Sequence, residues 1–337
     1  MREKILNLLS GKKVDAQPAF SGLIHITTEG LEREGLVFHE IHKDAKKMAK
    51  AAASTFHVTS MPSAALPLDL CVPAEALGAE VNFYGSREFQ FPQVKQALFE
   101  STKYLTTETT PSHGEDKSTD ILQRGRISMV CEAIGLLKND IGTEVVISGI
   151  IPGPYTLLLY LCNLRNLMIE MKKEPEIVSD ALLHLSSYLS KIGGAYCKAG
   201  ADFITVHEMG GSPGFIGPAR FEQFVLPALK ALHEKLPHPS VLSVCGNTNK
   251  SMPLLAQTGA SAISVDQTND LATSRVVLKD KLLFGNIDPV GKLWLGASTQ
   301  VAAAVIGAKE AGVDAVWPGC DLVPQTPIQN IKTFLQI

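Results

Sequence analysis

The second half of the chain alternates short, continuously apolar segments with longer segments in which apolar residues recur at helical spacing. The apolar segments cover 143–149, 202–206, 240–244, 262–265, 281–285 and 314–318. The periodic segments, which we predict to be helices, cover 174–198, 218–236, 250–258, 270–279, 298–311 and 328–336. Continuous apolar runs are typical of strands buried on both faces. Their repeated alternation with helices predicts a parallel sheet with right-handed crossovers.

The first half of the chain is less regular. It supplies apolar segments at 19–26 and 57–61, which we predict to be strands, and a predicted helix rich in Ala and Lys at 43–55. The segment 80–91 alternates polar and apolar residues around Gly85. That pattern predicts a hairpin outside the main sheet.

The number of strands favours a closed barrel. Without the hairpin, the chain contains about eight candidate strands. A doubly wound sheet would normally carry a GxGxxG or Walker loop after an early strand, and the sequence has neither. We therefore predict an α/β fold, a single (β/α)8 TIM barrel over residues 1–337 with an excursion near 80–119. The polar stretch 106–119 is expected to be a lid or a plain surface loop.

Composition and charge exclude several classes of protein. Hydrophobic residues make up 45% of the 337 positions and charged residues 19%, which is typical of a globular core and not of disorder. A net charge of −3 offers no basic surface for nucleic acid or anionic lipid. Glycine and proline interrupt the longest apolar run, 147–161, so no transmembrane helix is predicted. The first residues do not resemble a secretory signal, and we expect a cytoplasmic protein.

The six cysteines are scattered without a CxxC pair. In a cytoplasmic protein they are expected to be thiols or metal ligands, not disulfides. Cys131, Cys162 and Cys197 lie in strongly helical stretches and are expected to be ordinary core residues. Cys245 and Cys320 instead follow predicted strands.

Working residues of TIM barrels lie at the carboxyl ends of the strands. Polar residues that follow predicted strands are His207, Glu208, Cys245, Asn247, Asp266, Asn286 and Cys320. Two thiols and an acid at one rim suit a tetrahedral Zn²⁺ site, although the thiols could also be buried core groups and Asp266 a helix cap. Side chains alternate along a strand, so at most one of His207 and Glu208 faces the barrel mouth.

Four segments carry a resemblance to a known family: VLSVCGNTNK (241–250), SVDQ (264–267), FGNIDP (284–289) and WPGCDLVPQTP (317–327). With GPYT (153–156) and GFIGPARFEQFVLPALKAL (214–232), they resemble the uroporphyrinogen-decarboxylase superfamily, and more closely its methylcobamide:coenzyme M methyltransferases. The resemblance covers essentially the whole chain and implies a (β/α)8 barrel. The decarboxylase branch is the weaker match, because the stretch 20–30 lacks the arginines that bind substrate carboxylates in that branch.

The resemblance implies a zinc site of the pattern His-x-Cys…Cys. Cys245 and Cys320 occupy the cysteine positions, but Ser243 stands at the histidine position. Related zinc methyltransferases can offer a carboxylate from the next strand. We therefore expect Cys245, Cys320 and Asp266 to hold Zn²⁺, with the substrate thiolate as fourth ligand. Such an electron-rich zinc favours alkyl transfer over water activation.

The remaining rim residues are assigned to catalysis and to substrate binding. The expected catalytic residues are Glu208 and His207. The expected substrate-binding residues are Asn247, Asn286, Tyr155 and Ser243.

The resemblance implies methyl transfer from a methylated corrinoid to a thiol such as coenzyme M. Because the chain has no DxHxxG cobalamin fingerprint, the methylcobamide is expected on a separate corrinoid protein, which would dock over the loops at 106–119 and 208–218. The acceptor must react as a thiolate, and a free thiol is mostly protonated at neutral pH.

Three alternatives remain open. A barrel without zinc could exchange methyl groups with a folate-type nitrogen, using Asn247, Asn286, Asp288 and Glu208 as hydrogen-bonding groups. The chain could instead be a non-catalytic module that binds a corrinoid protein and has lost its zinc, or, less favoured, a uroporphyrinogen decarboxylase-like enzyme.

Overall fold

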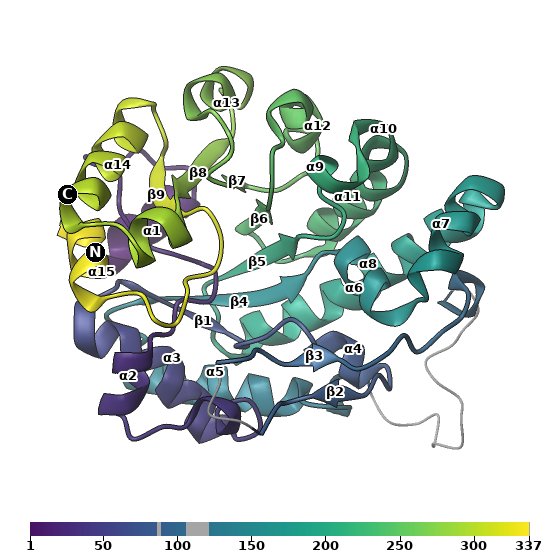
Figure 1. Cartoon of the computed structure of the whole chain (residues 1–337), viewed down its shortest axis with the longest axis horizontal. Helices are drawn as coiled ribbons and strands as arrows, with labels where there is room; N and C mark the ends of the chain where they lie inside the picture. The colour runs from purple at the N-terminus through teal and green to yellow at the C-terminus, as the bar shows by residue number, and fades with distance from the viewer. Residues whose placement is uncertain (86–88, 106–120, 337) are drawn as a thin grey trace.

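The computed structural model describes residues 1–85, 89–105 and 121–336. Its centre is a curled sheet of seven parallel strands, in which each strand pairs with the next one along the chain (Figure 1). In sheet order the strands are β1 (Ser63–Leu66), β4 (Val146–Pro152), β5 (Phe203–Glu208), β6 (Ser240–Val244), β7 (Ala262–Val265), β8 (Leu282–Ile287) and β9 (Ala315–Pro318). The predicted TIM-barrel class is confirmed. The strands β5 to β9 lie where the apolar runs predicted them, whereas β4 begins and ends three residues later than the predicted segment 143–149.

An irregular segment, 18–25, lies between the two edge strands β1 and β9. On one side, Phe20 N–H donates to the Val316 carbonyl and Val316 N–H donates to the Pro18 carbonyl. On the other side, Nε2 of His25 bonds to the carbonyl oxygen of Ser63. The backbone N–H of Ser21 donates to the hydroxyl oxygen of Ser63. This segment is the predicted strand at 19–26. It occupies the eighth position of the barrel without becoming a regular strand.

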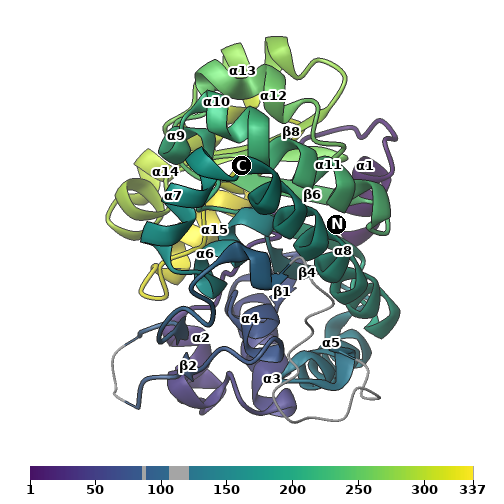
Figure 2. The same ribbon diagram turned by 90° about the vertical axis from the view of Figure 1, so that its right-hand side faces the viewer.

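Helices cover the outer face of the sheet, and α8 and α11 pack side by side outside the strands (Figure 2). The α-helices are α1 (Arg2–Leu9), α2 (Thr28–Arg33), α3 (Ala45–Thr59), α4 (Val72–Ala76), α5 (Ile127–Ile141), α6 (Pro154–Leu161), α7 (Leu164–Lys173), α8 (Pro175–Ala199), α9 (Pro213–Ile216), α10 (Pro218–Arg220), α11 (Leu226–Lys235), α12 (Met252–Leu255), α13 (Leu271–Val277), α14 (Ser298–Glu310) and α15 (Ile328–Gln336). Shorter 3-10 segments are η1 (Phe38–Glu40), η2 (Thr102–Leu105), η3 (Ile121–Gln123) and η5 (Asn249–Ser251), and π-helical segments are η4 (Phe221–Val225) and η6 (Pro289–Trp294).

The predicted strand at 57–61 is wrong. Helix α3 begins after Asp44, whose side chain accepts the Lys47 N–H, and continues through Thr59 to a left-handed Ser60. Four alanines at 49 and 51–53 give the helix high propensity, and its apolar face is buried against the sheet. Packing of the whole helix therefore outweighs the local β preference of Val58 and Thr59, and the strand β1 starts only at Ser63.

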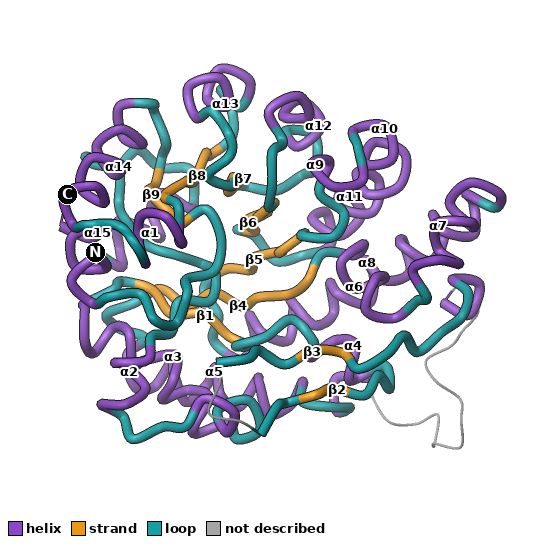
Figure 3. The backbone as a smooth tube through the Cα atoms, viewed as in Figure 1, coloured by secondary structure: helices purple, strands orange, loops and turns teal. Residues whose placement is uncertain are grey.

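The predicted hairpin lies outside the main sheet. Strands β2 (Val81–Asn82) and β3 (Gln93–Val94) pair with each other in antiparallel fashion and form a separate two-stranded sheet (Figure 3). This confirms the excursion predicted near residue 80. The stretch 106–119 lies outside the described residues.

The interior of the barrel is filled at its amino-terminal end. Large side chains from four different strands or edge segments meet there, namely Phe20, Phe203, Phe284 and Trp317, with ring centroids 5.0 to 6.5 Å apart. Helix α1 covers this end with Ile5, Leu8 and Leu9. Aromatic rings thus fill the amino-terminal end of the barrel interior, whereas the working residues of TIM barrels lie at the opposite, carboxyl-terminal end of the strands.

Candidate metal centre and active site

Three potential metal-ligand side chains meet at the carboxyl end of the barrel. They are His207 at the end of β5, Cys245 directly after β6 and Cys320 after β9. The Nε2 atom of His207 lies 3.3 Å from Sγ of Cys245, and the two sulfur atoms are 3.4 Å apart. One ligand atom from each residue lies within 4.8 Å of the others. This is the separation that a single ion bound by all three would require.

Strand register places these groups together. His207 on β5 pairs with Ser243 on β6, and Cys245 follows Ser243 by two residues. Side chains two residues apart on a strand point to the same face, so Cys245 extends above Ser243 toward the imidazole of His207. The neighbouring Glu208 points to the other face, against α6. Only one of His207 and Glu208 therefore faces the mouth.

The pKa values of His207, Cys245 and Cys320 are all shifted from their ordinary values. The hydrogen bond between the two thiols raises the pKa of Cys245 and lowers the pKa of Cys320 well below its ordinary value. Burial opposes protonation of His207, but the charges of Asp321 and Cys320 outweigh it and raise the pKa of His207 to about 9. Without a metal, these shifts favour the thiolate form of Cys320 and the protonated form of the His207 imidazole. Metal binding to such a set releases protons.

The donor set fits a soft divalent ion. Two sulfur atoms and one imidazole nitrogen are ligands that Zn²⁺ prefers, and catalytic zinc sites use three protein ligands and keep the fourth position open. His207 is fully buried and Cys245 is nearly so, whereas Cys320 is partly exposed. An ion bound by these three residues would therefore have buried ligands on the barrel side and would be accessible from the mouth, where Cys320 is partly exposed.

The structure does not bring Asp266 into this group. Among the residues that the structure describes, the ligand cluster consists of His207 and the two cysteines. One carboxylate oxygen of Asp266 accepts hydrogen bonds from the backbone N–H and the hydroxyl of Thr268, both at 2.8 Å. The side chain closes a turn in its own loop instead of reaching the sulfur atoms. The third potential ligand atom belongs to His207 of β5, a residue for which the sequence predicted only a catalytic role.

Ser243 lies beside His207, on the neighbouring strand β6. Its hydroxyl is buried, and within the described ranges it has no hydrogen-bond partner. The resemblance places a histidine at this position, and here the imidazole instead comes from His207, the residue paired with Ser243 on the adjacent strand. The imidazole of His207 thus reaches the space beside Cys245 from β5 instead of β6.

Glu208 is fully buried, and its carboxylate is saturated with hydrogen bonds. It accepts from the backbone N–H groups of Tyr155, Thr156 and Gly211 and from the Thr156 hydroxyl, at 2.5 to 3.0 Å. Burial raises the pKa of Glu208, and these hydrogen bonds counteract the rise. These hydrogen bonds identify Glu208 as the anchor of the α6 amino terminus, and among the described residues its carboxylate is not part of the ligand cluster.

The other predicted substrate-binding side chains are also engaged elsewhere. The Tyr155 hydroxyl donates to the Met171 sulfur of α7, and the Asn286 amide donates to the backbone carbonyls of Asp266 and Asn269. Asn247 is exposed and accepts from the Asn249 backbone and side chain. Each of these contacts supports a loop or a helix, and none joins the ligand cluster.

Two residues that the sequence did not single out lie against the cluster. The Ser212 hydroxyl donates to the Cys245 carbonyl at 2.5 Å and so ties α9 to the site. A carboxylate oxygen of Asp321 lies 3.9 Å from Nδ1 of His207. The available signal in the sequence was an acidic residue directly after Cys320, since histidines that ligate a metal commonly donate their second ring N–H to a carboxylate.

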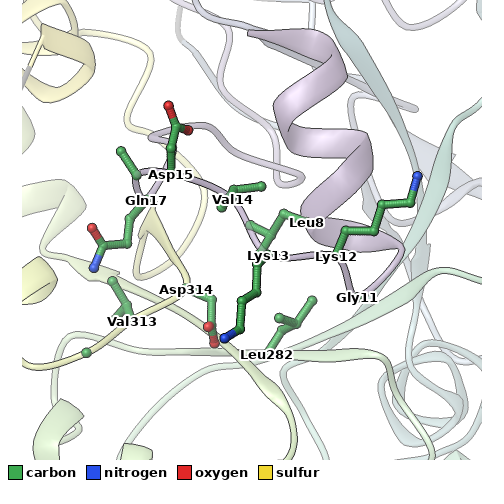
Figure 4. A pocket seen from close by; sticks show the side chains of 12 residues that line it. Leu8, Gly11, Lys12, Lys13, Val14, Asp15, Gln17, Leu282, Val313 and Asp314 are labelled. Carbon is green, nitrogen blue, oxygen red and sulfur yellow. The ribbon is translucent and has the colours of Figure 1, made fainter.

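A cavity of about 460 Å³ lies at the other end of the barrel. It is lined by Lys12, Lys13, Asp15 and Asp314, among others, where the α1 loop meets the beginnings of β8 and β9 (Figure 4). Barrel enzymes place their chemistry at the carboxyl ends of the strands, and this cavity lies at the amino ends. In the part of the chain that the structure covers, no helix is long and apolar enough to span a membrane.

Comparisons with known proteins identify the family to which the chain is similar. The family model of uroporphyrinogen decarboxylase (URO-D) matches residues 1–337. A methylcobamide:CoM methyltransferase, MtaA of Methanosarcina barkeri, is 30% identical over 337 residues, which is 99% of this chain and 96% of the relative. MtbA of Methanosarcina mazei, also a methylcobamide:CoM methyltransferase, is 30% identical with the same coverage. A solved methyltransferase from Methanosarcina mazei superposes with a TM-score of 0.90 at 28% identity, over 99% of this chain and 96% of that one.

Proposed function

The chain belongs to the uroporphyrinogen decarboxylase (URO-D) family, and from that premise we propose that it is a methyltransferase that moves a methyl group from a methylated corrinoid to a thiol. The observation that carries the proposal is the cluster of His207, Cys245 and Cys320 at the barrel mouth. A thiol acceptor needs a site that favours its anionic form, and this donor set suits a metal that provides one. The similar relatives MtaA and MtbA are methylcobamide:CoM methyltransferases.

We assign His207, Cys245 and Cys320 as the ligands of a Zn²⁺ ion. When bound, that ion deprotonates a thiol that coordinates it and keeps the thiolate at neutral pH. Cys320 already favours its thiolate form, because hydrogen bonds from Cys245 and His207 lower its pKa. The buried His207 ring offers Nε2 on the side of Cys245. The packed aromatic rings below the site fill the interior, so the acceptor has to enter from the mouth.

The methyl donor is proposed to be a methylcobamide on a partner corrinoid protein. Helix α9, in the loop 208–218, lies at the mouth because Ser212 is bonded to the Cys245 carbonyl. The side chain of Phe215 on this helix is 66% exposed. We expect this loop to contact the partner. The loop 106–119, to which the same role is assigned, lies outside the described residues.

The alternative of methyl exchange with a folate nitrogen has less support. Glu208 and Asn286, which would recognise the pterin, direct their hydrogen bonds at the protein backbone. The decarboxylase alternative lacks arginines in the segment 20–30. Neither alternative makes use of two facing thiols.

The proposal is tested by zinc content and by methyl transfer, both measured in reducing buffer. We expect one zinc per chain in the wild type and loss of zinc in Cys245→Ala and Cys320→Ala. We expect the wild type, but not these variants, to demethylate methylcobalamin or a methylated corrinoid protein in the presence of coenzyme M or another thiol. A zinc-free wild type that leaves the methylated corrinoid unchanged with every thiol tested would overturn the proposal.

A further inference from the structure

The imidazole of His207 has one ring nitrogen that the ligand cluster does not use. Nε2 faces Cys245, while Nδ1 is buried and has no hydrogen-bond partner among the described residues. If Nε2 binds a metal, Nδ1 must carry the ring proton, because a ligating imidazole is neutral. A buried N–H without an acceptor is costly. The position therefore requires an acceptor close to Nδ1.

Asp321 is placed to supply that acceptor. Its Oδ2 atom is 3.9 Å from Nδ1 of His207, and its Oδ1 atom accepts the Ile24 backbone N–H at 2.8 Å. The Ile24 contact fixes one oxygen of the carboxylate and leaves the other toward the ring. A shift of about 1 Å would bring Oδ2 to the ordinary hydrogen-bond distance.

We propose that Asp321 is a positioning residue: its Oδ2 atom accepts the Nδ1–H of His207 and holds the ring with Nε2 directed at the metal. The inference rests on the proposed zinc site. Asp266, the other acidic residue considered at this rim, cannot serve as the acceptor for His207, because its carboxylate is bonded to Thr268 in its own loop. Since His207 comes from β5 and not from the usual strand, its orientation depends on an acceptor from the β9 loop, which also carries Cys320.

The substitution Asp321→Asn separates this role from a structural one. The amide oxygen of the asparagine can still accept the Ile24 N–H, so the contact that ties the β9 loop to the segment 18–25 is preserved. The amide nitrogen then faces Nδ1–H, and two donors oppose each other. Outer-shell partners of zinc-bound histidines are worth roughly 10- to 100-fold in metal affinity, and we expect a loss of that size for Asp321→Asn.

The matched control is Asp266→Asn. This variant removes the same charge from the same rim, while the asparagine oxygen can still accept from Thr268. We expect its zinc affinity, measured by competition with a chromophoric chelator, to stay within about threefold of the wild type. In ¹⁵N-labelled, zinc-loaded protein, the Nδ1–H signal of His207 should move upfield in Asp321→Asn and stay in place in Asp266→Asn.

The outcomes distinguish the two proposals. Loss of zinc affinity and movement of the His207 signal in Asp321→Asn alone support the positioning role. Unchanged affinity in Asp321→Asn, together with zinc loss in His207→Ala, would overturn this inference and leave the zinc site standing. Equal losses in Asp321→Asn and Asp266→Asn would indicate a general charge effect and also overturn it. A wild type that binds no zinc would remove both proposals.

Discussion

Ser243 and His207 occupy one register position on two neighbouring strands. The resemblance places an imidazole on β6 at Ser243, and this chain carries it on β5, at the paired residue. Neighbouring strands of a sheet lie about 4.8 Å apart, a distance that an imidazole side chain can bridge. The ring can therefore reach the space near Cys245 from either strand.

The exchange of positions can be tested directly. We expect His207→Ser to lower zinc affinity by roughly 100-fold or more, because it removes a ligand and not merely an outer-shell group. Adding Ser243→His should restore most of that affinity, since the ring returns to the space from β6. The control is Ser264→His in the His207→Ser background: Ser264 pairs with Ser243 on its other side, and a ring there should not restore binding. Restoration by the control, or none by Ser243→His, would contradict the argument.

A buried histidine outside the proposed metal site predicts how stability depends on pH. His233 is fully buried, its Nδ1 atom contacts the Ser240 hydroxyl, and burial lowers its pKa to about 3. Between pH 6.5 and pH 3, the unfolded chain binds a proton at this position and the folded chain does not. Stability must therefore fall as the pH falls through that window, by about 2 kcal/mol between pH 7 and pH 5.

The variant His233→Gln cannot take up this proton. We expect its free energy of unfolding, measured in urea, to fall by about 2 kcal/mol less than that of the wild type between pH 7 and pH 5. Equal losses in the two proteins would show that His233 does not remain neutral in the folded state.

At the scale of elements, the junction between β4 and α6 depends on a residue from β5. Gly153 follows the strand, and Pro154 opens the helix without a side-chain cap from its own N-cap residue. Glu208 of β5 accepts the N–H groups of Tyr155 and Thr156 instead. An acid beside a helix amino terminus also interacts favourably with the helix dipole. The start of α6 is thus fixed by the neighbouring strand.

This arrangement predicts a structural effect for Glu208→Gln. The new amide group would place a donor against backbone N–H donors, and we expect the free energy of unfolding to drop by about 1–3 kcal/mol. Zinc affinity should change little, because Glu208 lies on the face of β5 opposite His207. Glu222→Gln in η4, an exposed position, serves as the control. If Glu208→Gln lost zinc binding without losing stability, Glu208 would instead have to be assigned a role in the active site.

At the scale of the whole molecule, the barrel is completed by the segment 18–25, and this closure leaves no space at Gly22. A Cβ atom there would lie 2.5 Å from Cη2 of Trp317, 2.6 Å from Oγ1 of Thr205 and 2.8 Å from Cε2 of Phe203. These side chains come from strands on opposite sides of the barrel. The backbone at Gly22 therefore packs directly on the ring that fills the interior.

Two glycine substitutions compare this position with an open one. We expect Gly22→Ala to lower the free energy of unfolding by about 1–3 kcal/mol, because the surrounding rings cannot move apart without strain. A methyl group on Gly307, inside α14, would meet no atom of the surrounding chain within 4 Å. There, Gly307→Ala should raise stability by about 0.5–1 kcal/mol. Urea unfolding of both variants checks the pair, and a Gly22→Ala protein as stable as the wild type would contradict this account of closure.

The barrel, and the end of it that carries the candidate site, could be predicted from the pattern of residues alone. Continuous apolar runs and helical periodicity placed β5 to β9 and the helices between them, because burial on both faces leaves a one-dimensional signature. The same runs located Cys245 and Cys320 at strand ends. The helix that absorbs 57–61 was not predictable in this way, because its extent depends on packing along its full length.

Which side chains meet at the barrel mouth depends on the folded arrangement of the strands and loops. Register joins His207 to Ser243, and thus brings it to Cys245, which lies 38 positions further along the chain. Local hydrogen bonds turn Asp266 and Glu208 toward Thr268 and α6. The residue types at the rim were visible in the sequence, but the direction of a side chain depends on partners contributed by other strands. For that reason the proposed ligand set and the place of Asp321 follow only from the folded chain.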